Sequence, residues 1–470
     1  MSAPFPTRPR LGDHVLARRH LVGDEEHVVL HDLRTGRLVK IGPREWTLLA
    51  AADGTRDLPG VVLAAAREGA HAREPALRAY LGQLHEAGLL HDDSQPPSSE
   101  IETLETAPLT PPDRPLSLLP DFSLHCDGSG SCCRLYASVL FAPIEAARAR
   151  ALLPEILDGG ARPERVFLPE HGPGPCAGAA VAMIDGRCAY LADSGWCKLH
   201  TKAGPTAKPL GCSLFPASFV DDGERVRVST WVECACVLAS VGRPGGAPLI
   251  DPAAQTRGDL DPAVHVARLP ERALVRDGEH APAASLRRFM DDLAACAPPR
   301  DIPRALWSLA DRLESKGLER TARFDPDPPS IDADALRPWI EALHARASRR
   351  ARDDEAWRSD RDLARLGTIA IADATRALLL PSALAALLEQ PPPAPASEAF
   401  SLRATLHGLR LIGELPLTHA LRDHAVRLLV ARALPPALGT DDRAFDHPLA
   451  LLEAMLRGHG LSVYAHDLLP

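Results

Sequence analysis

Hydrophobic and polar residues alternate along two short stretches near the beginning of the chain. Residues 14–20 and 27–31 both have the two-residue period of a β-strand. Residues 33–37 contain a Thr-Gly pair typical of a turn, and residues 38–41 have the composition of a third strand. The pattern therefore predicts three consecutive short strands.

Three helices are expected after these strands. Pro43 suits the first turn of a helix that ends near Asp53. Thr55 or Asp57 then caps a second helix, because both side chains accept hydrogen bonds from free backbone N–H groups. A third helix is expected from about residue 74 to 87. The resulting order is three strands followed by three helices.

The remainder of the chain divides by composition. Residues 94–119 are rich in Pro and Ser and have no sustained apolar period, which predicts a linker. From about residue 284, apolar residues recur at helical spacing, interrupted by breaks such as the three prolines 391–393. We therefore expect an α+β protein. Its parts are a domain of three strands and three helices (11–93), the linker (94–119), an irregular cysteine-rich domain (120–250) and an α-helical domain (251–470).

Bulk properties narrow the classes of function. With 470 residues, the chain is long enough for two or three hydrophobic cores. A net charge of -9 argues against a nucleic-acid binder that works by neutralising phosphates. No apolar run reaches the roughly 18 residues that would span a bilayer, and residues 1–10 lack the apolar core of a secretory signal. We therefore expect a cytoplasmic protein without membrane or nucleic-acid partners.

Cysteines are concentrated in the middle of the chain. Nine of the ten fall between Cys126 and Cys236. Cytoplasmic thiols stay reduced, so such clustering favours metal binding over disulfides. Thiolates bind zinc and the iron of iron–sulfur clusters, and four of them, or three with a His, complete a tetrahedral shell. The candidate ligands are Cys126, Cys132, Cys133, Cys188, Cys197 and Cys212.

The neighbouring residues indicate how several of these thiols are presented. Adjacent Cys132 and Cys133 are expected to point in different directions unless the backbone turns sharply, which nearby glycines permit. Cys212 follows Pro209 and precedes Pro216, so its thiol is expected on a rigid loop. His200 adds an imidazole three residues after Cys197.

The remaining cysteines and histidines are weaker candidates for metal ligands. Cys234 and Cys236 follow a strand-like segment, which would direct both thiols to one face, and either of them is a further candidate ligand. Cys296 lies on a helical apolar face and is expected to pack in a core. His125 and His171 have the chemistry of ligands, but a lone His near a metal loop is more often a neighbour of the ligands or a surface group. Asp185, Asp193 and Glu233 are alternatively groups that support proton transfer near a metal centre, and more simply solvated charges; Cys176 has no assigned role.

The cysteine pattern resembles a known family. Cys126, Cys132-Cys133, Cys188, Cys197-Lys-Leu-His and Lys-Pro-Leu-Gly-Cys212-Ser-Leu-Phe-Pro together resemble the YkgJ-type zinc- or iron-chelating cysteine-cluster family. Flagellin lysine N-methylases share this cluster and also continue into a long helical region. The resemblance implies a metal centre, and in that group an iron–sulfur centre that works with S-adenosylmethionine. Ser129 stands where the family has a further Cys, and Cys176, Cys234 or Cys236 would have to replace it.

The first part of the chain carries a second resemblance. Residues 28–46 and the Asp-Gly-Thr break at 53–55 resemble the PqqD-like winged-helix domains. Many enzymes that modify ribosomal peptides bind the leader peptide through such a domain. The resemblance implies that a peptide adds as a strand beside residues 38–41. The alternative is a winged helix that only packs on its neighbour.

Two classes of function follow. The preferred hypothesis is an enzyme that captures a peptide or protein and modifies a side chain at a metal centre, for instance by N-methylation. The competing hypothesis is a non-enzymatic binding adaptor whose fold is stabilised by structural zinc, or a metal carrier for a partner enzyme. No residue of catalysis can be named, and phosphate-binding or zinc-protease motifs do not occur.

Overall fold

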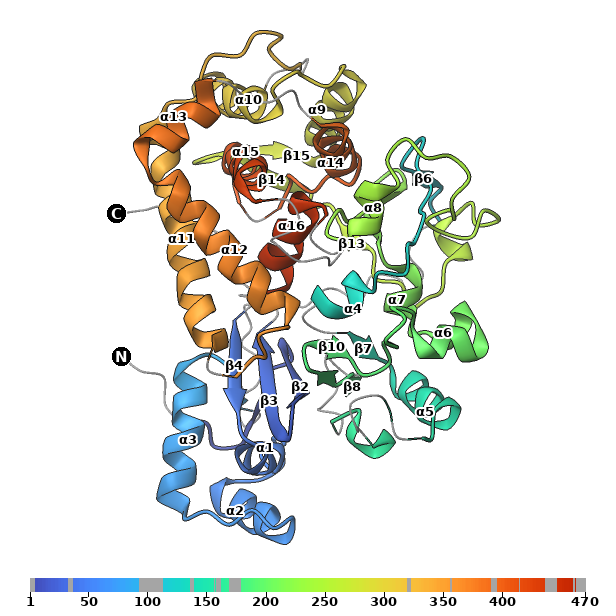
Figure 1. Cartoon of the computed structure of the whole chain (residues 1–470), viewed down its shortest axis with the longest axis vertical. Helices are drawn as coiled ribbons and strands as arrows, with labels where there is room; N and C mark the ends of the chain where they lie inside the picture. The colour runs from blue at the N-terminus through green and yellow to red at the C-terminus, as the bar shows by residue number, and fades with distance from the viewer. Residues whose placement is uncertain are drawn as a thin grey trace. The chain divides into compact units, whose positions relative to one another are not determined.

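The structure, a computed structural model, combines helices and sheets, 48% helical and 17% strand, and so confirms a mixed α+β class. Two compact units are distinguished, the first within residues 1–111, 136–211 and 458–460, the second within the rest, and each is considered by itself (Figure 1). Residues 120–250 contribute to both units. The structure describes residues 5–32, 37–92, 113–135, 139–155, 157, 162–168, 179–318, 323–355, 357–389, 395–413, 415–435, 446–459 and 461.

The three predicted strands form the centre of unit 1. They are β2 (Val15–Val22), β3 (Glu25–Asp32) and β4 (Leu38–Ile41), and each pairs antiparallel with the next. This confirms the strand prediction, while most of the predicted turn at 33–37 lies outside the described residues. The sheet continues beyond β2 into β9 (Met183–Ile184) and β10 (Arg187–Cys188), in the order β10-β9-β2-β3-β4.

Three helices cover this sheet, as predicted. They are α1 (Pro43–Ala50), α2 (Leu58–Arg67) and α3 (Glu74–Glu86). Asp57 caps α2, because its carboxylate accepts a hydrogen bond from Gly60 N at 3.0 Å. Val28 and Leu30 alternate along β3 toward one face and pack in the same core as Trp46 and Leu81.

Strand β4 lies at one edge of the five-stranded sheet. Asp32 N donates to Arg37 O at 2.9 Å, so this pair exchanges hydrogen bonds across the hairpin. Hydrogen-bonded and non-bonded pairs alternate in an antiparallel ladder. In the observed register, Leu38 opposite His31 and Lys40 opposite Val29 are therefore non-bonded pairs, and Leu38 and Lys40 direct their N–H and C=O groups to the outer edge.

The rest of unit 1 consists of short elements. β1 (Pro9–Leu11) pairs with β5 (Leu90–Asp92), and β7 (Leu140–Phe141) pairs with β8 (Ala179–Ala180). The helical segments are α5 (Pro143–Leu152), η1 (Pro163–Arg165), α6 (Lys198–Ala203) and η2 (Pro205–Ala207).

Unit 2 contains a second sheet, of order β13-β11-β12-β6. β6 (Leu116–Leu118) lies within the last part of the predicted linker and pairs in parallel with β12 (Val226–Thr230). β11 (Ala217–Asp221) and β13 (Ala267–Arg268) complete this sheet. β14 (Arg272–Arg276) and β15 (Glu279–Pro282) form a separate hairpin.

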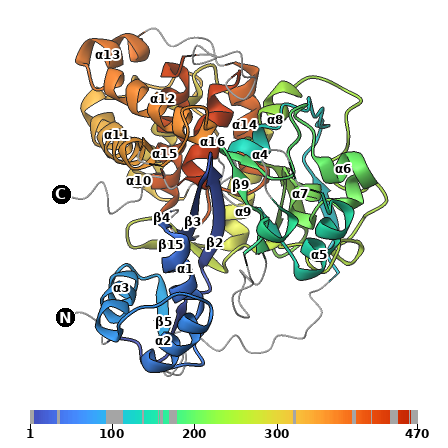
Figure 2. The same ribbon diagram turned by 60° about the horizontal axis from the view of Figure 1, so that its bottom comes forward.

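Helices make up most of unit 2 and confirm the periodicity seen after residue 284. α11 (Ala333–Glu355) and α12 (Leu363–Leu378) run side by side in both views (Figures 1 and 2). α10 (Ile302–Lys316) packs on α15 (Leu417–Ala433). The short helices α4 (Ser131–Leu135), α7 (Leu210–Leu214) and α8 (Ala235–Ala239) carry cysteines. The others are α9 (Ala283–Ala295), α10 (Ile302–Lys316), α11 (Ala333–Glu355), α12 (Leu363–Leu378), α13 (Pro381–Glu389), α14 (Ala396–His407), α15 (Leu417–Ala433) and α16 (Pro448–Gly458).

Within the described ranges, no helix alone has the length and apolar character needed to cross a bilayer. α12 and α13 meet those criteria only when taken together, and they are bent by 88° where they join.

Candidate metal centre

Cys132 and Cys133 lie on one turn of helix α4 in unit 2. Their Sγ atoms are 3.9 Å apart, although consecutive side chains of a helix usually diverge. The approach to the helix turns sharply at Gly128 and Gly130, which have φ angles of 70° and 67°, a region that glycine adopts without strain. Cys133 N then donates to Gly130 O at 2.9 Å. The turn anticipated at these glycines is present, and the two thiols stay together.

This separation can be compared with that in a metal site. Two thiolates bound to one tetrahedral zinc at ~2.3 Å are ~3.8 Å apart. The Cys132–Cys133 distance of 3.9 Å is close to that value. The pair therefore fits two corners of one tetrahedral shell without further movement of the sulfur atoms relative to each other.

A second group of thiols forms in unit 2 from distant parts of the chain. Cys126 is hydrogen-bonded to Cys236, which raises the pKa of the Cys126 thiol, and burial raises it further. At Cys236 the hydrogen bond from Cys126 lowers the pKa, but the hydrogen bond with Cys234 and burial outweigh it and raise the pKa overall. Cys126 is exposed, while Cys234 and Cys236 are buried. Because a thiol binds a metal as its thiolate, a metal at this group would have to displace these protons.

The sheet explains how Cys126 meets Cys236. In the parallel pair β6–β12, Leu118 lies opposite Val228. Each cysteine follows its strand residue at the same distance along the chain. Because parallel strands leave the sheet at the same edge, the segments after them begin side by side.

Cys234 and Cys236 do not continue a strand, so that prediction is wrong. β12 ends at Thr230, and Cys234 is the N-cap residue of the short helix α8, which contains Cys236. The two thiols nevertheless contact each other. The first turn of α8, and not the alternation of a strand, brings the two side chains together.

Asp127 is a part of this site that sequence reasoning missed. The Cys236 thiol donates a hydrogen bond to Asp127 Oδ1 at 3.1 Å. The same oxygen accepts from Ser129 N at 2.9 Å. At the position of the missing thiol, the Ser129 hydroxyl donates to Ser131 Oγ at 3.4 Å. The position of Asp127 directly after Cys126 was the only sequence signal for it.

His125 also borders this group. Its backbone N donates to Ser240 Oγ at 2.8 Å. Its Nε2 atom is buried and has no hydrogen-bond partner among the described residues. An unpaired buried ring nitrogen costs free energy unless a proton acceptor, a donor or a metal meets it. His125 is therefore a further candidate ligand beside the thiols.

Cys212 lies on α7 and not on a loop, which corrects the expected setting. The helix is short and begins after Pro209. Leu210, at the beginning of this helix, still belongs to unit 1, and its N donates to Oε1 of Glu145 in α5 of the same unit at 2.8 Å. The Cys212 side chain is half-buried, and the Phe215–Pro216 peptide bond that follows is cis.

Cys188 and Cys197 belong to unit 1. Cys188 ends β10, and Cys197 is the N-cap residue of α6. Tyr190 lies between them in sequence, and burial, followed by the charge of a Cys188 thiolate, raises its pKa. The Tyr190 hydroxyl is buried without a hydrogen-bond partner among the described residues. Both thiols thus border a buried polar group, and His200 follows on α6.

Together, the six predicted ligands fall into two sets. Cys126, Cys132, Cys133 and Cys212 are assigned to unit 2, and Cys188 and Cys197 to unit 1. Cys176 and His171 lie outside the described residues. In the part of the chain that is described, no three His, Cys, Asp or Glu side chains converge closely enough to hold a metal ion as they stand.

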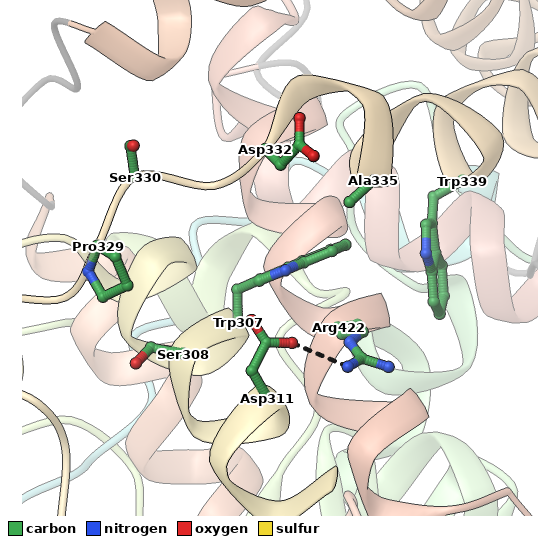
Figure 3. A pocket seen from close by; sticks show the side chains of 9 residues that line it. All are labelled: Trp307, Ser308, Asp311, Pro329, Ser330, Asp332, Ala335, Trp339 and Arg422. Atoms are coloured by element: carbon green, nitrogen blue, oxygen red, sulfur yellow. Dashed lines mark hydrogen bonds and ion pairs between the residues drawn. The ribbon is translucent and has the colours of Figure 1, made fainter. Parts of the chain in front are cut away.

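A pocket of about 350 Å³ elsewhere in unit 2 is a separate candidate (Figure 3). It lies among α10, α11 and α15, with Trp307 and Trp339 in edge-to-face contact at 6.5 Å between ring centroids. Its charged groups are already engaged: Asp311 pairs with Arg422 at 2.8 Å, and Asp332 accepts from the backbone N of Asp334 at 3.0 Å. These contacts leave neither carboxylate without a partner.

Comparison with models of protein families, with curated proteins and with solved structures finds no match to this chain.

Proposed function

We propose that this protein binds an iron–sulfur cluster or zinc through its clustered cysteines, and that it captures and modifies a peptide or protein substrate. The observation that carries the metal proposal is the 3.9 Å separation of the Cys132 and Cys133 sulfurs, which suits two ligands of one metal. The contacts of Cys126 with Cys236, and of Cys236 with Cys234, add three thiols in the same unit.

These five thiols exceed the four that one tetrahedral site needs. Cys126, Cys132, Cys133 and Cys236 are the favoured first set, with Cys234 and Cys212 as alternates. A bound iron–sulfur cluster would supply one-electron redox chemistry, whereas zinc with four thiolates would hold the loops together. The resemblance to the YkgJ-type cluster and to flagellin lysine N-methylases favours modification of a side chain, with S-adenosylmethionine as cosubstrate.

Peptide capture is proposed at the outer edge of β4. Leu38 and Lys40 direct their backbone hydrogen-bonding groups away from β3, which is what an added peptide strand requires. The order of three strands and three helices in unit 1 is consistent with the proposed PqqD-like domain. The side chain of Lys40 is exposed, as is common on an edge strand.

The deciding experiment is metal analysis of protein purified without oxygen. We expect iron and acid-labile sulfide, and a brown colour with absorbance near roughly 400 nm if a cluster is bound. Colourless protein that contains zinc would indicate a purely structural zinc site. Protein that retains neither metal would refute the metal proposal. Elemental analysis and visible absorbance distinguish these three results.

Ligand assignment requires substitutions with a matched control. Cys132→Ser, Cys133→Ser and Cys236→Ser should each lower the metal content per chain. Cys296→Ser should not, because the Cys296 thiol donates to Asp292 O at 3.3 Å at the end of α9 and is not one of the clustered thiols. Full metal content in both the Cys132 and Cys133 variants would contradict the assignment.

A further inference from the structure

A second pocket of unit 2, of about 320 Å³, is lined mainly by apolar side chains. It lies between the end of α9 and one face of α14. Leu293, Phe324, Phe400 and Leu406 belong to its lining and are all at least nine-tenths buried. Cys296 lines the same pocket and is half-buried. Small-molecule sites are typically concave and apolar with few polar groups, and this pocket has that character.

Arg403 is the one charged residue in the described lining. Its guanidinium lies over the Phe400 ring, 5.4 Å from the ring centroid. Within the described ranges it makes no ion pair and no hydrogen bond, and its Nε atom is buried without a partner. Other half-buried arginines of this unit are paired, such as Arg432, which forms two hydrogen bonds of 2.8 Å with Glu398. An anion in the cavity would give this guanidinium the charged partner that it lacks among the described residues.

We propose that this pocket binds a small aliphatic carboxylate, with its chain among the apolar side chains and its carboxylate on Arg403. A planar guanidinium suits a carboxylate because it donates two parallel hydrogen bonds. The volume of 320 Å³ accommodates about ten non-hydrogen atoms at ~30 Å³ each. A medium-length fatty acid such as octanoate has about that size.

Calorimetric titration of the full-length protein with octanoate, and with octanol as the uncharged analogue, tests the proposal. We expect octanoate to bind about tenfold more tightly than octanol, because only the carboxylate pairs with Arg403. Equal affinity for the two would overturn the role of the charge. Absence of binding by either would overturn the proposal as a whole.

Two substitutions locate the site. Arg403→Met keeps the length and apolar stem of the side chain but removes its charge, so the preference for octanoate over octanol should disappear. Arg376→Met is the matched control, since Arg376 is exposed and pairs with Asp373 elsewhere in the unit. An equal loss of affinity in both variants would contradict the assignment to this pocket.

Cys296 provides an independent readout. Octanoate in the pocket should slow the alkylation of this thiol by N-ethylmaleimide several-fold, measured by peptide mass spectrometry, and Arg403→Met should abolish the protection. N-acetyl-Leu-Leu, which also ends in a carboxylate, tests whether a peptide C-terminus is the true ligand. Protection by this peptide and none by octanoate would overturn the assignment to an aliphatic acid.

Discussion

The thiol of Cys236 donates a hydrogen bond to Asp127 Oδ1 across 3.1 Å, which joins the segment after β12 to the segment after β6. A carboxylate that accepts a hydrogen bond from a thiol orients the sulfur, and it can take up the proton that the thiol loses when it binds a metal. The contact links the proposed metal site to the sheet of unit 2, and it can be changed without removing any thiol.

Asp127→Asn should weaken metal binding while leaving every cysteine in place. Partners of this kind contribute about 10- to 100-fold to metal affinity. Competition with a chelator measures the change. Asp121→Asn, at an exposed position in the same segment, should keep the affinity of the wild type, and equal affinities in all three proteins would contradict the role of Asp127.

Lys40→Pro should weaken peptide capture without breaking the β3–β4 ladder. The proline removes the N–H that Lys40 directs to the outer edge, and β3 does not use that group. Peptides selected from a displayed random library on the wild type should bind the variant roughly 3- to 10-fold more weakly, the loss expected for one hydrogen bond.

Lys40→Thr serves as the control for this substitution. Threonine removes the same charge but retains the N–H and has a high strand propensity. It should therefore bind the selected peptides like the wild type. Equal binding by the proline variant would argue against strand addition at β4.

His424 should make the stability of unit 2 depend on pH. Burial lowers the pKa of His424 to about 4; the charge of Glu453 opposes this shift, and the charges of Arg427 and Arg410 add to it. Its pKa in the unfolded chain is about 6.5, so the unfolded state binds more protons between these values and stability falls as the pH drops. Between pH 7 and pH 5, this one group should cost about 2 kcal/mol of unfolding free energy.

Urea unfolding of His424→Leu at both pH values tests this. The variant should lose about 2 kcal/mol less than the wild type on acidification, because leucine does not titrate. His280→Leu, at an exposed position, should retain the pH dependence of the wild type. The same loss in the His424 variant and the wild type would refute the prediction.

Asp354→Ala should destabilise unit 2 strongly. This carboxylate is fully buried and lies 2.9 Å from both Arg350 Nη2 and Arg358 Nε. Its removal leaves two buried guanidinium groups with less compensation, which typically costs about 3–5 kcal/mol. Denaturant unfolding measures the loss, and Asp353→Ala, its exposed neighbour, should cost well under 1 kcal/mol.

Local patterns in the sequence determined much of the secondary structure. A short apolar run predicts β4, a cap at Thr55 or Asp57 predicts α2, and apolar residues at helical spacing predict α9. Each of these signals acts within a few residues, because strand alternation, helix periodicity and capping all depend on neighbours along the chain. The six candidate thiols were likewise identified from spacing and chemistry alone.

Tertiary structure alone decided which thiols meet. Cys126 reaches Cys236 because β6 and β12 pair in parallel, and no local signal encodes a pairing between strands so far apart. The same holds for β9, which extends the sheet of unit 1 beside β2, and for Arg403, which remains without an acidic partner among the described residues. Contacts between distant residues depend on the register and packing of whole elements, so they become visible only when the chain is folded.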